Sequence, residues 1–213
     1  MVSMMLRNCV MNTLDAVDAV ERFEARVFGL AAEQGVALTA EDVAGLEDLA
    51  ERYVRETLRL LEACVTAADQ ARARDMFAPV LSVCERFFLQ TDPRIPDQGG
   101  LFGLICDCYL ARSLLSQVSE RMRLIRGFPM LATNPHSEAG IIESLVGRDV
   151  TTLLDEIVHG VAATPAIRFA PNGAYQLIGP MRATGRVSEW EARWEDLVAD
   201  YSRATGMAFT TAA

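Results

Sequence analysis

Two cysteines one residue apart, Cys106 and Cys108, are the first candidates for chemistry in this sequence of 213 residues. Cysteines two to four residues apart on a loop can hold zinc, and closely spaced thiols can form a disulfide. A helix turns by about 100° per residue, so side chains two apart point in nearly opposite directions. If the segment is helical, this pair can neither ligate one metal ion nor join in a disulfide.

The stretch that contains the pair, residues 100–125, has the apolar spacing of a core helix. On a seven-residue repeat, apolar residues occupy every a and d position, and Cys108 is one of them. The positions are Leu101, Leu104, Cys108, Ala111, Leu115, Val118, Met122 and Ile125. Further apolar residues cover most of the other faces, which predicts a helix buried at the centre of a bundle or in a subunit interface.

The remaining cysteines favour the same interpretation. Cys64 and Cys84 fall on the apolar stripes of their predicted helices, and Cys9 adjoins Val10. A free buried cysteine behaves as a small hydrophobe, and an odd total of five argues against a disulfide framework. The alternative is that Cys64, Cys84 and Cys108 converge from three helices on a metal ion or cluster.

Glu156 and His159 form the other chemically suggestive pair. Their Glu-x-x-His spacing places both on one helical face, and di-iron helix bundles use this motif twice. The second copy is missing here, because the other histidine, His136, has no glutamate three residues before it. Asp155 also lies four residues before His159, which suggests a surface ion pair. Glu156 and His159 remain the metal candidates of a sequence that otherwise predicts no metal, no cofactor and no catalytic residue.

The charge of the chain restricts its partners. A net charge of −9 argues against nucleic acid held through its phosphates, which requires a basic face. Residues 27–47 resemble a helix-turn-helix in outline, but Glu41, Asp42 and Glu47 stand where phosphate-facing residues are needed. All 20 basic residues are arginine, which excludes a Schiff-base or phosphate-loop lysine. With no uncharged apolar run of 18 residues and no convincing signal peptide, we expect no membrane span and a cytoplasmic location.

The periodicity predicts an all-α protein whose first part is an antiparallel bundle of four long helices, residues 1–127. We expect helices at 4–33, at 39–68 with Thr39 as its cap, at about 75–90 with Asp75 as its cap, and from 100 to the sequence RGFP. Short connections make successive helices antiparallel neighbours.

Residues 128–213 predict a smaller region packed on this bundle as one domain. Two shorter helices are expected at about 137–146 and 149–163, and a C-terminal helix at 189–204. Between them, residues 167–178 predict a β-hairpin, because Asn172-Gly173 favours the tight turn that matches strand twist.

The leading hypothesis for function is a non-catalytic interaction or scaffold protein that self-associates or binds a protein partner. It is based on the surplus of apolar helix surface and the scarcity of catalytic residue types. The candidate partner face lies on the C-terminal helix, and tryptophan and tyrosine are typical interface anchors. Its residues are Trp190, Trp194, Leu197 and Tyr201.

The alternative hypothesis is a small-ligand-binding helical regulatory domain with an internal aromatic pocket. The candidate pocket residues are Tyr53, Phe77, Phe87, Phe88 and Tyr109. A metal-dependent helical enzyme that uses Glu156, His159 or the cysteines is the third hypothesis.

Overall fold

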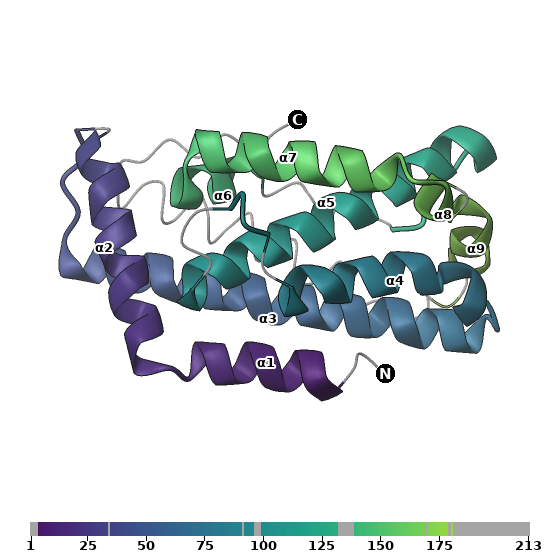
Figure 1. Ribbon diagram of the computed structural model, residues 1–213, viewed down its shortest axis with the longest axis horizontal. Coiled ribbons are helices and arrows are strands. Elements are labelled where there is room, and N and C mark those ends of the chain that lie inside the picture. The colour runs from purple at the N-terminus through teal and green to yellow at the C-terminus, as the bar shows by residue number, and fades with distance from the viewer. Residues whose placement is uncertain are drawn as a thin grey trace.

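Every helix or strand assigned in the described residues of the computed structural model is an α-helix, so the all-α prediction is confirmed. The structure describes residues 4–33, 35–90, 92–95, 99–131, 139–168, 170–178 and 180. Figure 1 shows the arrangement of the helices. They are α1 Met4–Leu14, α2 Val17–Glu33, α3 Ala40–Gln70, α4 Arg74–Leu89, α5 Gly100–Arg126, α6 Ala139–Val146, α7 Arg148–Ala162, α8 Pro165–Arg168 and α9 Pro171–Gln176.

Helix α3 follows the predicted pattern closely. The Thr39 hydroxyl accepts a hydrogen bond from the Asp42 amide at 3.2 Å, and the Asp42 carboxylate accepts one from the Thr39 amide at 2.7 Å. This reciprocal capping box satisfies two amides that a helix start leaves free. On the solvent side, Glu51 and Arg55 form an ion pair at 3.0 Å. The apolar stripe that contains Cys64 is buried throughout: Val43, Leu46, Ala50, Tyr53, Leu60, Cys64 and Ala68.

The predicted first helix at 4–33 is wrong in one respect, because the chain breaks it into α1 and α2 around Asp15. The Thr13 hydroxyl bonds back to the Cys9 carbonyl at 2.9 Å, and threonine and aspartate compete in this way with the helical backbone. After the break, α2 turns steeply away from α1 (Figure 1). It crosses α5 where a Cβ on Gly100 would lie only 2.9 Å from the Ala19 Cα, so the two backbones nearly touch.

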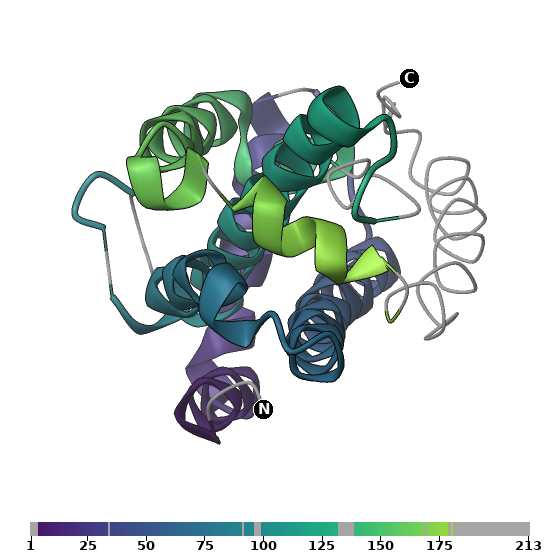
Figure 2. The same cartoon turned by 90° about the vertical axis from the view of Figure 1, so that its right-hand side faces the viewer.

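Helix α5 occupies the centre of the molecule (Figure 2). The predicted antiparallel bundle of four long helices is not supported. It packs against α1, α2, α3, α4, α6, α7 and α9. Each residue from Leu101 to Leu115 is buried except Asp107. The helix ends at Gly127, whose φ of 84° is the left-handed conformation that glycine tolerates at a C-cap.

By length and composition, α5 is also the one described helix that could cross a membrane. However, 83% of the apolar stretch is buried among the other helices, as in the core helix of a globular protein. The buried apolar side chains of the described residues form a continuous cluster from Leu6 to Leu177.

The predicted hairpin at 167–178 is wrong, because α8 and α9 occupy this segment. Pro171 starts α9, and Asn172-Gly173 lies in its first turn. Gly173 allows α9 to approach α4: a Cβ there would lie 2.8 Å from the Met76 Cβ. The burial repeats with a helical period, through Ile167, Ala170, Ala174 and Leu177.

Candidate functional site

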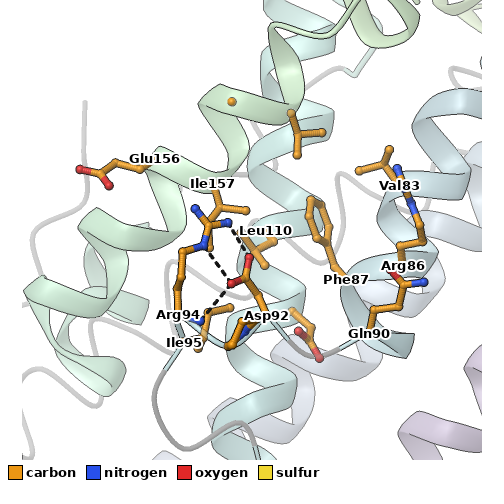
Figure 3. A pocket seen from close by; sticks show the side chains of 14 residues that line it. Val83, Arg86, Phe87, Gln90, Asp92, Arg94, Ile95, Leu110, Glu156 and Ile157 are labelled. Carbon is orange, nitrogen blue, oxygen red and sulfur yellow. Dashed lines mark hydrogen bonds and ion pairs between the residues drawn. The ribbon is translucent and has the colours of Figure 1, made fainter.

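A cleft of about 620 Å³ opens between α4, α5, α7 and residues 92–95 (Figure 3). We call it the Asp107 cleft. Phe87 of α4, Leu110 of α5 and Ile157 of α7 project toward one another in its wall. The described residues lining it are Val83, Arg86, Phe87, Gln90, Asp92, Pro93, Arg94, Ile95, Asp107, Leu110, Glu156, Ile157, Gly160 and Val161. Its size and mainly apolar wall are typical of small-molecule sites.

One side of the cleft is fixed by an ion pair within the loop after α4. The Asp92 carboxylate accepts hydrogen bonds from Arg94 Nε at 2.9 Å, Arg94 Nη2 at 2.5 Å and the Arg94 amide at 3.0 Å (Figure 3). These bonds lower the pKa of Asp92 and raise the pKa of Arg94. The two charges therefore neutralise each other within the loop.

Asp107 is the unusual group of this site. It lies between Cys106 and Cys108 on α5, is partly buried, and lines the cleft. No described residue forms a hydrogen bond or ion pair with its carboxyl group. Burial raises the pKa of Asp107 well above its ordinary value of 3.8, because the charged form loses hydration that nothing replaces. A carboxyl group in a cleft with a raised pKa and no described partner is a candidate for a functional group.

The sequence carries a signal for Asp107 that helical periodicity alone does not reveal. It is the one charged residue between Leu101 and Tyr109, within a run that is otherwise apolar or glycine. An acid in the middle of a buried helix needs either a partner or an opening. Here the structure supplies an opening.

The structure does not gather the five predicted pocket residues around one cavity. Phe87 lines the Asp107 cleft, whereas the other four are core residues that are at most 7% exposed. The Tyr109 hydroxyl donates to the Asp155 carboxylate at 2.9 Å and ties α5 to α7. Burial first, and this acceptor second, raise the pKa of Tyr109. The four core residues are Tyr53, Phe77, Phe88 and Tyr109.

Tyr53 belongs to a buried polar cluster between α3 and α5. The guanidinium of Arg112 lies over its ring at 4.5 Å, and Arg112 Nε donates to the Thr57 hydroxyl at 2.7 Å. The Thr57 hydroxyl in turn donates to the Tyr53 carbonyl at 2.8 Å. A buried arginine is tolerated only with such partners, so this cluster fixes the register of α3 against α5.

The two metal candidates lie on the exposed side of α7. Glu156 and His159 are both exposed, and Glu156 points away from the centre of the cleft (Figure 3). Among the described residues, no three histidine, cysteine, aspartate or glutamate side chains come together as metal ligands would. Asp155, the expected ion partner of His159, accepts the Tyr109 hydrogen bond.

Four of the five thiols are buried: Cys64, Cys84, Cys106 and Cys108. Burial raises the pKa of Cys64 and of Cys108 to about 12, and it raises the pKa of Cys84 and of Cys106 as well. The thiolate is the nucleophile and the metal ligand, so these groups are unreactive at neutral pH. Cys106 and Cys108 are both buried because other helices pack around most of the circumference of α5.

The predicted partner face and the C-terminal helix at 189–204 lie outside the described residues. Its four residues, Trp190, Trp194, Leu197 and Tyr201, are therefore not placed. Comparison of the chain with protein-family models, curated proteins and solved structures finds no match. The Asp107 cleft is thus the feature on which a function can be argued.

Proposed function

We propose that this protein binds a small amphipathic organic molecule in the Asp107 cleft. The observation that carries the proposal is a carboxyl group without a described partner, set in a cleft whose wall is largely apolar. The apolar wall contributes binding energy that does not depend on the orientation of the ligand, and the carboxyl group fixes that orientation. This combination is typical of specific ligand sites.

The lining residues favour binding over covalent catalysis. The described part of the cleft contains no serine, threonine, cysteine or histidine, so the side chains that it offers as nucleophiles are carboxylates alone. The buried thiols nearest to it on the chain, Cys106 and Cys108, are held protonated. We therefore prefer ligand binding at this cleft to covalent catalysis, with Phe87 as the one residue of the predicted aromatic pocket that lines it.

Gly160 offers a direct test of the cleft. It follows Glu156 and Ile157 by one helical turn, lines the cleft, and would place a Cβ with nothing within 4 Å. A leucine at this position takes up cleft volume without a backbone clash, and it replaces a poor helix former in α7. Gly160→Leu is therefore expected to fold and to lose ligand binding.

Gly29 provides the matched control, since it also lies within a helix, in α2, and has nothing within 4 Å of a Cβ. Binding of hexylammonium, 1-hexanol and hexanoate is followed by NMR through the backbone amides of α7. The proposal expects at least one probe to bind the wild type and Gly29→Leu, and to bind Gly160→Leu at least tenfold more weakly. Binding by none of the three probes, or equal binding to both variants, contradicts it.

Self-association is the second candidate function, and one observation favours it. At the C-terminal end of α5, Leu124 is 70% exposed and Ile125 is 61% exposed. Adjacent apolar side chains on a surface suggest a contact with a second protein chain. Sedimentation equilibrium tests this: a dimer that dissociates in the Leu124→Glu variant supports it, and a wild-type monomer at every concentration contradicts it.

A further inference from the structure

The charged groups around the Asp107 cleft differ in whether they are available to form an ion pair with a ligand. On the loop, Asp92 and Arg94 are bound to each other. Arg86 of α4 and Glu156 of α7 are exposed at the margin, where water screens their charges. Asp107 of α5 is the group removed from water, and its chain neighbours are neutral thiols. When Asp107 is ionised, its carboxylate is therefore the one negative charge that the described residues place in the interior of the cleft.

An ionised Asp107 needs a positive partner in this setting. A carboxylate in a cleft that Leu110 and Ile157 also line loses hydration, and a cation that donates hydrogen bonds to it compensates this loss. A neutral ligand forms a weaker hydrogen bond, and an anion is repelled. Among the described lining residues, Arg86 at the margin is the counter-charge open to an anion, since Arg94 is held by Asp92.

We propose that the cleft selects organic cations: an ammonium group paired with Asp107, carried on a short apolar body that packs against Phe87, Leu110 and Ile157. The inference rests on the proposed binding function and names its ligand class. Asp107 is the specificity-determining residue of the site.

Ligand binding is then linked to proton release. Burial raises the pKa of Asp107, so the empty cleft holds a neutral acid up to an elevated pH. An ammonium ligand favours the carboxylate, and the proton leaves as the cation binds. Affinity for a cation therefore rises with pH, by up to tenfold per pH unit, until Asp107 of the free protein is ionised. A neutral ligand that accepts a hydrogen bond from the protonated carboxyl group binds less tightly as pH rises and that group ionises.

Three probes with the same six-carbon body separate these cases: hexylammonium, 1-hexanol and hexanoate. Their dissociation constants are measured by NMR titration of the full-length protein and of Asp107→Asn at several pH values. We expect hexylammonium to bind the wild type at least tenfold more tightly than the other two probes, with affinity rising with pH. Asp107→Asn, which keeps the side-chain shape, is expected to lose both the preference and the pH dependence.

Asp75→Asn is the matched control, because it removes the same charge from an exposed position of α4 outside the cleft. It is expected to keep the preference for hexylammonium. Thermal denaturation of each variant verifies that it is folded.

The outcomes separate the two proposals. If none of the three probes binds the wild type, the proposed function itself fails. If 1-hexanol binds as tightly as hexylammonium and Asp107→Asn changes nothing, the cleft is a ligand site but the cation selectivity is refuted. Tightest binding of hexanoate, lost in Arg86→Gln, also refutes it, because the anchor is then the guanidinium.

Discussion

Replacing Asp107 by asparagine is predicted to stabilise the ligand-free protein at neutral pH. Asparagine has the shape of aspartate but no ionisable group, so it occupies the same space on α5. In the folded state burial opposes ionisation of the wild-type carboxyl, which has no described partner, by raising its pKa. In the unfolded chain the same group ionises at its ordinary pKa.

The sign and size of the effect follow from proton linkage. Between the ordinary pKa of 3.8 and the raised folded value, the folded protein binds more protons than the unfolded chain. The free energy of unfolding of the wild type therefore falls as pH rises, by about 1.4 kcal/mol per pH unit in that window. Above the folded pKa the loss is complete and constant. Below pH 3.8 both side chains are neutral, and the two proteins differ by about 1 kcal/mol or less.

Urea denaturation of both proteins, followed by circular dichroism between pH 4 and pH 8, measures this difference. The stability of Asp107→Asn minus that of the wild type should grow with pH and then level off. Subtraction of the wild-type stability at each pH removes the titration of all other groups. A difference that stays constant with pH would refute the reasoning. So would a wild type more stable than Asp107→Asn at pH 7, which indicates a cationic partner for Asp107.

Two further predictions concern the core. Cys108→Ala is expected to lower the free energy of unfolding by about 1 kcal/mol, as for a buried packing group; a loss of bound metal from the variant would contradict its role as a space-filling thiol. On the same helix, Leu114→Ala at a fully buried site should cost about 3 kcal/mol in urea denaturation, whereas Leu124→Ala at a 70% exposed site should cost less than about 0.5 kcal/mol. Similar losses at both positions would mean that the end of α5 is covered in solution.

The sequence predicts well those helices in which the buried residues recur at helical spacing, on one face or around the whole helix. The stripe of α3 and the seam of α5 are of this kind, although Ile125, the last residue of the seam, is exposed. The break between α1 and α2 was not predicted, because apolar residues continue at helical spacing on both sides of Asp15. The direction of α2 is decided by its contact with Gly100, which is distant in the sequence.

The segment 167–178 shows how a local signal can mislead. Asn-Gly favours a hairpin turn when strands flank it, but here Pro171 starts a helix and Gly173 serves a close approach to Met76. The partner that decides the conformation lies on α4, about a hundred residues earlier.

The candidate site depended even more on tertiary structure. Phe87 was predicted as a pocket residue because of its type, and it lines the cleft. Asp107 was overlooked, since on a helix buried all round the period does not reveal which residue faces an opening. That opening is formed by α4, α7 and the loop at 92–95, and no local pattern contains all three.

The central position of α5 has a consequence for how the chain is made. Residues 1–99 leave the ribosome first, yet α2, α3 and α4 each pack against a helix that ends only at Arg126. Until that residue has been synthesised and released from the exit tunnel, the apolar faces of these earlier helices can pack only against residues that precede α5. Nascent chains in this interval expose apolar surface that chaperones bind, and α5 can cover the earlier helices only once Gly127, its C-cap, has left the exit tunnel.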